Sequence, residues 1–484
     1  MDDDHSLVVY HTATGDWTDG AIKSWSANDK NRVLFAAFTG GTGPDGCYQL
    51  VTGGIKHIKF WKINSRNLSS KKGLFGKVGK IQPITNATVV EGKVVTGTSS
   101  GDLYVWEGHQ CASKVAAHSG PVSCASSTSR GGLITGGKDG KIILWDNELS
   151  QLEQFELSKL EPAPLRPVPV SVAMNSHMSK IVCATLAAEI YEISVDSGSA
   201  CCLVQGHYNG ELWGLACHPV DPDVYATTGD DKMLRVWSLA NKGITAKVKL
   251  GGESRALAFS PDDGRLIAAG LNSGGLQVFE AASMDNIFKA RHAKEWISDV
   301  KFSPDAQTLA VASHDNNIYL YSAKSGDAYD FYGRLDKHNS YVTHMDFSSD
   351  GQFMRSTCGA YELLFYKVSA AQQLPGGASE LKDVAWHTET CPLGWGVQGI
   401  WPEGADGTDI NAVDRYGDHL ATADDFGKVR IFAYPVLEQG APSNLGTGHS
   451  SHVTNVRFNC NDSYLISVGG NDKCVFQWKL QVEQ

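Results

Sequence analysis

The sequence predicts an all-β protein made of tandem β-propellers, and the prediction depends on a repeat and on the turns within it. A unit of two short alternating strands around a Gly/Asp turn recurs about every 45 residues, and nearly every copy ends in an aromatic residue. The chain contains 51 glycines, as expected if each unit needs tight turns with positive φ. A repeat of this length and content is typical of a propeller blade and not of a helical solenoid.

Eleven copies can be aligned by eye, of which the first and the fifth are degenerate. Their terminal aromatic residues are Tyr10, Trp61, Trp106, Trp145, Tyr191, Trp237, Phe279, Tyr321, Tyr366, Phe432 and Trp478. Neighbouring aromatics are 39 to 51 residues apart, except for one step of 66 residues between Tyr366 and Phe432. That step predicts an atypical insertion at about residues 370–412.

The spacing also predicts how the blades divide between domains. Seven blades, within the usual four to eight, would form a C-terminal propeller over residues 151–484. About four blades remain for a partial N-terminal propeller over residues 1–150. The segment SKLEPAPLRPVPV (158–170) contains four prolines and is the most linker-like stretch of the chain. Four blades could close only as a very small ring, so we expect the N-terminal propeller to be incomplete in this chain. An open propeller would expose aggregation-prone strand edges, so we favour truncation or completion by another polypeptide over a real short form.

Polar residues recur at matching offsets within two of the copies, and they resemble the His–Ser/Thr–Asp–Trp network of WD40 repeats. The two sets are His118, Thr135, Asp139 and Trp145, and His207, Thr227, Asp231 and Trp237. A histidine bonded to an aspartate could also be a catalytic base with its orienting partner. We favour a structural network, because the pattern repeats and no nucleophile accompanies it. In the last copy, Val468 stands at the hydroxyl position.

Other motif matches fail on their context, so the sequence predicts no enzyme, no cofactor and no metal site. GTGPDG (41–46) fits a dinucleotide-binding pattern, but a β-like segment follows it instead of a helix. GTSSG (97–101) fits a nucleophile elbow, yet it occupies the turn inside a blade. EGADGTDIN (403–411) lacks the ligand spacing of a calcium-binding EF-hand loop.

Composition restricts the location of the protein. The chain starts with the acidic MDDDHSLVVY, and no apolar run approaches the roughly 18 residues of a membrane span. Eleven cysteines without a CxxC pair indicate reduced thiols and a cytosolic protein. The net charge of −11 gives no overall attraction to an acidic partner. We therefore expect no membrane and no nucleic-acid partner.

Several segments together resemble the echinoderm microtubule-associated protein-like (EML) family. They are HIKFW (57–61), KKGLFGK (71–77), QGHYNGELWGLACHP (205–219), SHDNNIYLY (313–321), DDFGKVRIFAYP (424–435), GTGHSSHVTNVRF (446–458) and, most specifically, TCPLGWGVQGIWPEGADGTDINAV (390–413). The resemblance implies tandem packed propellers that bind tubulin or microtubules. Family members usually also carry an upstream hydrophobic HELP motif, further blades and often a coiled coil, and this sequence contains none of these.

Two groups of residues are candidates for partner binding. Eight basic residues and no acidic one lie between Gly46 and Val90: Lys56, Lys59, Lys62, Arg66, Lys71, Lys72, Lys77 and Lys80. We expect Lys71 and Lys72, with Lys77 and Lys80, to form a loop that contacts an acidic surface; the alternative is a merely solvated loop. The second group is Trp395 and Trp401, which could anchor an interface or pack between the propellers.

The sequence therefore predicts a non-catalytic microtubule- or tubulin-binding protein of the cytoplasmic cytoskeleton, on spindle, ciliary or other microtubules. Further partners would be cytoskeletal or axonemal proteins that complete the open N-terminal propeller. The alternative is a generic WD40 scaffold or adaptor, such as a ubiquitin-ligase substrate receptor. The tubulin prediction depends on the resemblance and not on the repeats.

Overall fold

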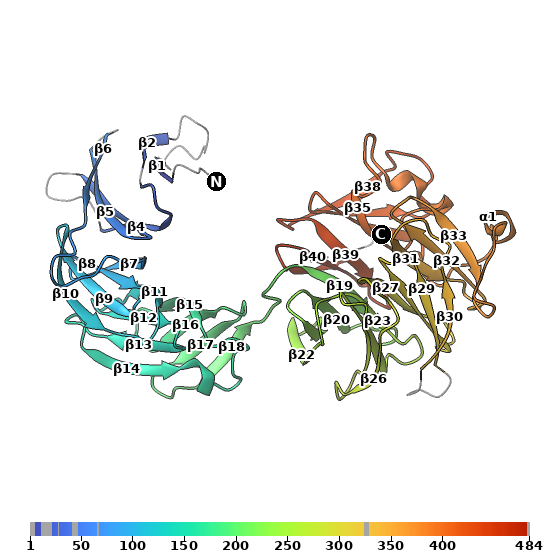
Figure 1. Ribbon diagram of the computed structural model, residues 1–484, viewed down its shortest axis with the longest axis horizontal. Coiled ribbons are helices and arrows are strands. Elements are labelled where there is room, and N and C mark those ends of the chain that lie inside the picture. Colours follow the sequence, from blue (N-terminus) through green and yellow to red (C-terminus); the bar gives the residue numbers. More distant parts are fainter. Residues whose placement is uncertain are drawn as a thin grey trace. The chain divides into compact units, whose positions relative to one another are not determined.

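Antiparallel strands make up nearly all of the regular structure in the computed structural model of the chain (Figure 1). The structure describes residues 5–10, 22–27, 29–40, 47–64, 67–323 and 329–481. In these ranges the helices are short: η2 (Leu157–Lys159), α1 (Gly377–Glu380) and η3 (Trp395–Ile400). None of them has the length and apolar character of a membrane-spanning helix. The all-β prediction is confirmed.

The chain divides into two compact units, residues 1–205 and residues 206–484. In the first unit, the described strands form one two-stranded and four four-stranded sheets. These are β1 (Ser6–Tyr10) and β2 (Ile22–Ala27); β3 (Val33–Phe38), β4 (Tyr48–Gly54), β5 (His57–Asn64) and β6 (Asn67–Lys72); β7 (Ile84–Val90), β8 (Lys93–Thr98), β9 (Asp102–Glu107) and β10 (Gln110–Ala116); β11 (Val122–Ser127), β12 (Leu133–Gly137), β13 (Lys141–Trp145) and β14 (Gln151–Glu156); β15 (Pro169–Met174), β16 (Lys180–Thr185), β17 (Ile190–Ser194) and β18 (Ala200–Val204).

In the second unit, the described strands form five four-stranded sheets and one three-stranded sheet. These are β19 (Leu212–Cys217), β20 (Val224–Gly229), β21 (Met233–Ser238) and β22 (Gly243–Lys249); β23 (Ser254–Phe259), β24 (Leu266–Leu271), β25 (Leu276–Glu280) and β26 (Asn286–Ala290); β27 (Ile297–Phe302), β28 (Thr308–Ser313), β29 (Ile318–Ser322) and β30 (Asp330–Leu335); β31 (Val342–Phe347), β32 (Phe353–Cys358), β33 (Leu363–Lys367) and β34 (Gln372–Gln373); β35 (Ile410–Tyr416), β36 (His419–Asp424), β37 (Lys428–Ala433) and β38 (Ser443–Thr447); β39 (Val453–Phe458), β40 (Tyr464–Gly469) and β41 (Val475–Lys479).

The repeat aromatics mark the sheets. From Trp61 to Trp478, each of them lies on the third strand of its sheet, and Tyr10 lies on β1. Strands follow one another in chain order within every sheet, so each sheet is a simple meander. Most of these aromatics are buried, for example Trp106 and Tyr191, because the third strand is covered by the neighbouring sheets. The repeat therefore predicted the sheets one by one.

The sheets of the second unit close into a ring, because the last sheet bonds to the first. The Leu212 amide donates to the Gly470 carbonyl at 3.2 Å, and the Thr454 hydroxyl donates to the Leu212 carbonyl at 2.6 Å. Leu212 and Trp237 of the first sheet share a core cluster with Ile466 of the last. The described residues of this unit contain six sheets, one fewer than the roughly seven blades that the sequence predicted.

The predicted boundary at residue 150 is also too early. The sheet β15–β18, which contains Tyr191, belongs to the first unit. Its side chains Ile181 and Tyr191 form one buried cluster with Ile134 and Phe155 of the sheet β11–β14. The proline-rich segment 158–170 joins these two neighbouring sheets. Prolines identified a loop correctly, but loops connect blades as well as domains.

The sheets of the first unit follow one another in an arc, with β1–β2 at one end and β15–β18 at the other (Figure 1). At the first end, Leu7 of β1 packs in a small cluster with Leu50, Trp61 and Ile63 of the sheet β3–β6. At the other end, Val182 and Leu203 remain exposed. The arc presents β6, with its lysines, as the outer strand of the sheet β3–β6.

Candidate functional site

The first predicted polar set comes together in the sheet β11–β14. His118 Nδ1 lies 3.0 Å from Asp139 Oδ1, and its Nε2 lies 2.9 Å from Thr135 Oγ1. Trp145 Nε1 donates to the same hydroxyl at 2.9 Å. Burial is the main effect on the histidine and lowers the pKa of His118, against the attraction of Asp139. Every polar atom of the set thus has a partner, which avoids roughly 1–3 kcal/mol for each group left unpaired.

The second set repeats this arrangement in the sheet β19–β22, with one addition. His207 lies 3.0 Å from Asp231 and 2.8 Å from Thr227, and Trp237 donates to Thr227 at 2.7 Å. Arg235 of β21, which the sequence analysis missed, donates to Asp231 Oδ2 at 2.7 Å. In the sequence, Arg235 is indistinguishable from the other polar residues of an alternating strand, so no pattern marked it as buried. Burial lowers the pKa of His207 to about 4, so this histidine is neutral at pH 7.

The last sheet corrects a detail of the alignment. The sequence placed Val468 at the hydroxyl position, but Ser467 supplies the hydroxyl. Trp478 Nε1 donates to Ser467 Oγ at 2.8 Å, and His449 Nε2 lies 2.9 Å from it. Asp472 accepts from His449 at 3.0 Å. The shift of one residue moves a side chain to the other face of a strand, so the alignment by eye pointed to the wrong face.

Lys71 and Lys72 are the last two residues of β6, so they lie on a strand and not in the predicted loop. Lys77 and Lys80 follow in the connection to β7. The side chains of all four are exposed, and none of them forms an ion pair with a carboxylate that the structure describes. We call these four residues the basic surface.

Other members of the basic stretch differ from the basic surface. Lys59 lies 3.4 Å from Asp29 and is largely covered. Arg66 lies outside the described residues. Between the lysines of the basic surface and directly after them, three apolar side chains are exposed: Leu74 by 51%, Val78 by 38% and Ile81 by 68%. The segment 71–81 thus alternates free cations with exposed apolar groups.

The two candidate tryptophans belong to the second unit and differ in accessibility. Trp395, at the start of η3, is 68% exposed. Trp401 packs against the buried cluster around Val397 and Phe432, and its Nε1 donates to the Pro392 carbonyl at 3.2 Å. Of the two, Trp395 remains available to a partner. Between the two tryptophans, Gly396 packs closely on Tyr434. A Cβ at this position would lie 2.4 Å from the Tyr434 hydroxyl oxygen, so a larger residue would push the two segments apart.

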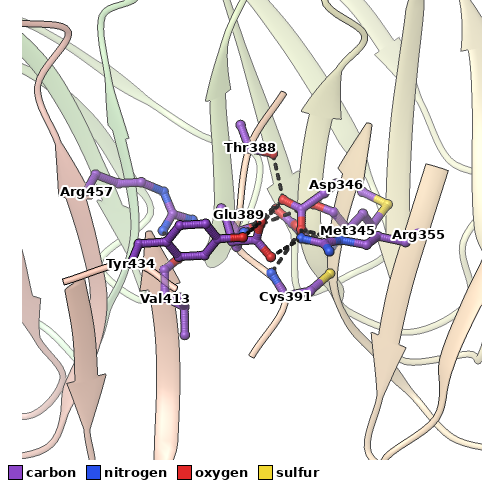
Figure 2. Close-up of polar contacts among 11 residues, drawn as sticks. Met345, Asp346, Arg355, Thr388, Glu389, Cys391, Val413, Tyr434 and Arg457 are labelled. Carbon is purple, nitrogen blue, oxygen red and sulfur yellow. Dashed lines mark hydrogen bonds and ion pairs between the residues drawn. The ribbon is translucent and has the colours of Figure 1, made fainter. Parts of the chain in front are cut away.

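The insertion predicted at about 370–412 is held by a buried ionic cluster (Figure 2). Asp346 of β31 accepts from Arg355 Nε at 3.2 Å and Nη2 at 3.0 Å. It also accepts from the Thr388 hydroxyl at 2.6 Å, the Thr390 amide at 2.9 Å and the Cys391 amide at 3.1 Å. A single carboxylate on the ring therefore binds several donors of the insertion.

Arg355 of β32 completes the cluster. Arg355 pairs with Glu389 of the insertion, and its guanidinium lies 4.5 Å from the ring centroid of Trp386. Glu389 also accepts a hydrogen bond from the Tyr434 hydroxyl at 3.2 Å. Burial alone would raise the pKa of Asp346, but the charge of Arg355 and the hydrogen bonds hold it well below its usual range. Burial raises the pKa of Glu389, despite the charge of Arg355. The cluster is fully partnered and attaches the insertion to two neighbouring sheets.

Family models of the first and second β-propellers of echinoderm microtubule-associated proteins match residues 1–193 and 212–480. Echinoderm microtubule-associated protein-like 2 of Rattus norvegicus is 36% identical over 485 residues, which are 99% of this chain and 72% of the relative. The chain belongs to the EML family. Echinoderm microtubule-associated protein-like 1 of Mus musculus is 35% identical over 97% of this chain and 58% of its own length. Echinoderm microtubule-associated protein-like 4 of Homo sapiens is 35% identical over 99% of this chain and 49% of its own length.

One further cluster of this EML chain has the composition of a metal site. The ligand atoms of His338, Cys358 and Glu362 all lie within 4.8 Å of one another. His338 Nε2 lies 2.6 Å from the Ser356 hydroxyl, and Glu362 accepts from the Asn339 amide at 3.0 Å. These are the positions of the His–Ser/Thr–Asp network, with a glutamate as the acid. We therefore interpret the cluster as another blade network.

Proposed function

We propose that this chain is a non-catalytic protein of the microtubule cytoskeleton that binds tubulin or microtubules through the basic surface. The observation that carries the proposal is the group of four exposed lysines without acidic partners, Lys71, Lys72, Lys77 and Lys80. EML relatives are named as microtubule-associated proteins, which supports tubulin as the acidic partner. In the networks around His118, His207 and His449, both histidine ring nitrogens have partners within the chain, and no nucleophile accompanies them, which supports a structural role rather than catalysis.

Charge explains why a local surface is needed. The chain as a whole carries a net charge of −11, so it is repelled by an acidic partner at long range. A patch of lysines gives attraction only at short range and only in one orientation. The exposed Leu74, Val78 and Ile81 then supply apolar area, which contributes affinity that salt does not weaken. We expect binding with a moderate dependence on salt.

Charge reversal at Lys71 and Lys72 tests the proposal. The double variant K71E/K72E should lose about tenfold or more in microtubule affinity, which corresponds to about 1.4 kcal/mol. Co-sedimentation over a range of microtubule concentrations measures the effect. K247E/K249E is the matched control, because Lys247 and Lys249 are exposed lysines on β22, the outer strand of another sheet.

Equal affinities of the two double variants would contradict the assignment to the basic surface. Failure of the unaltered chain to bind would contradict the function itself and leave the generic WD40 scaffold as the explanation. Imaging of a tagged chain beside spindle and axonemal markers distinguishes the locations, and we expect cytoplasmic microtubule staining in either case.

A further inference from the structure

A cavity of about 330 Å³ lies in the second unit where the first strands of its sheets converge. Residues from all six sheets line it, among them Trp213 (β19), Arg255 (β23), Ser298 (β27), Thr343 (β31), Asn411 (β35) and Asn455 (β39). We call it the ring cavity. Its volume is within the range of small-ligand sites in proteins.

Arg255 has an unusual environment in the ring cavity. Its guanidinium carbon lies 4.1 Å from the ring centroid of Trp213 and 4.2 Å from that of Trp296, so two indoles sandwich it. Among the described residues, no carboxylate lies within ion-pair distance of it. Both faces of the cation are therefore fixed, while the hydrogen-bonding edge is left without an acceptor.

Two buried donors of this sandwich lack a hydrogen-bond partner. They are Arg255 Nε and Trp213 Nε1. A buried donor without an acceptor costs roughly 1–3 kcal/mol, so two beside one cavity indicate that the acceptor comes from outside the chain. Asp299 is the only described carboxylate in the lining, and it already accepts from the amides of Val300 at 2.9 Å and Met345 at 3.0 Å.

The wall beside the sandwich is preformed. His314 stacks on Trp296 with ring centroids 4.2 Å apart, and Tyr341 stacks on His314 at 4.5 Å. Burial lowers the pKa of His314 to about 4, so the ring is uncharged at pH 7. Arg255 is thus held in one place by a continuous stack of planar groups, which lowers the entropy lost when a ligand binds.

We propose that the ring cavity binds a carboxylate of a peptide partner, with Arg255 and the Trp213 indole N–H as its donors. A guanidinium edge matches the two oxygens of a carboxylate, and the indoles cover the apolar atoms next to it. Glu211, Asp230 and Glu253 lie near enough to act on the charge of Arg255. These three carboxylates would repel a polyanion such as a nucleic acid. We therefore infer a ligand that presents a single carboxylate to the cavity. This proposal does not depend on microtubule binding.

Indole NMR of the full chain tests it, because the chain contains twelve tryptophans and the Trp213 signal can be assigned with W213F. The probes are acetyl-Gly-Ala-Glu-Ala-Gly-amide, its Gln counterpart, and the Gln peptide with a free C-terminus. The Glu peptide should shift the Trp213 indole N–H saturably and bind at least about tenfold more tightly than the capped Gln peptide. Binding of the uncapped Gln peptide alone would assign the carboxylate to a chain end.

Substitution of the arginine completes the test. R255Q and R255K should each weaken binding of the Glu peptide about tenfold or more. The indole signals of tryptophans other than Trp213 and Trp296, which contact Arg255, should stay in place and report an intact fold. R265Q, directly before β24 of the same sheet and outside the cavity lining, should bind like the unaltered chain. No shift at Trp213 with any peptide up to about 10 mM, equal binding of the capped Glu and Gln peptides, or tighter binding of inorganic phosphate would overturn the proposal.

Discussion

Arg355 and Arg255 are two arginines of the second unit that stack on tryptophans and differ in what their hydrogen-bonding edges meet. Arg355 lies over Trp386 and pairs with Asp346 and Glu389. Arg255 lies between Trp213 and Trp296 and pairs with no described carboxylate. The first arrangement joins parts of the fold, whereas the second leaves donors for a ligand.

Internal partners distinguish the charged residues that stabilise this fold from those available for binding. A buried charge with all its partners inside the protein stabilises the fold, because removal of one partner leaves the other uncompensated. A fixed charge without an internal partner contributes little to the fold and is available for binding. The same criterion separates Lys59, paired with Asp29, from the free Lys71 and Lys72.

The largest expected effect comes from the two arginines themselves. R355Q should lower the free energy of unfolding by about 3–5 kcal/mol, because it leaves Asp346 and Glu389 buried without a cation. R255Q should lower it by about 1 kcal/mol or less, the value of a partly exposed cation–π contact. Urea unfolding followed by circular dichroism measures both. Similar losses of unfolding free energy for R355Q and R255Q would contradict the conclusion that only Arg355 stabilises the fold through buried partners.

A smaller effect is expected from two neighbouring threonines of β20. Thr227 Oγ1 bonds to His207 and Trp237, whereas Thr228 Oγ1 is buried without a partner. T227V should therefore cost about 1–3 kcal/mol in the free energy of unfolding, and T228V should be neutral or stabilising. The two variants control for each other, since the loss of a hydroxyl is the same. A larger loss of unfolding free energy for T228V than for T227V would contradict the assignment of the His207 and Trp237 hydrogen bonds to Thr227.

The smallest effect is a dependence of stability on pH. His207 has a folded pKa of about 4, below its ordinary value of 6.5, so the unfolded chain binds the proton first as pH falls. Its contribution is complete above about pH 6.5 and is lost as pH falls towards 4, with about 0.5–1 kcal/mol lost between pH 7 and pH 6. Unfolding at both pH values measures it. H207Q should flatten this slope, and H177Q, at an exposed position, should leave it unchanged.

Much of the fold could be predicted from the sequence because each blade is a local meander. The aromatic of every repeat from Trp61 to Trp478 identified the third strand of a sheet. Domain membership could not be read in this way, since the repeat around Tyr191 has ordinary spacing on both sides. Its contacts with Ile134 and Phe155 decide the matter, and they depend on which sheets are neighbours.

The candidate sites were predictable only where they lie within one blade. The sets around His118 and His207 come together as the offsets suggested, because both ends of each set belong to one sheet and its entry loop. Arg255 and its two indoles come from three neighbouring sheets, and no spacing in the sequence relates them. Lys71 and Lys72 stood out by charge alone, and the charge pattern could not tell a strand from a loop.

The decisive experiment for microtubule binding is co-sedimentation of the unaltered chain of 484 residues with stabilised microtubules, at low and at raised ionic strength. We expect the chain to pellet with microtubules and its affinity to fall as salt screens the basic surface. A chain that stays in the supernatant at low salt would contradict the proposed function. A chain that pellets with an affinity independent of salt would contradict the role of the lysines.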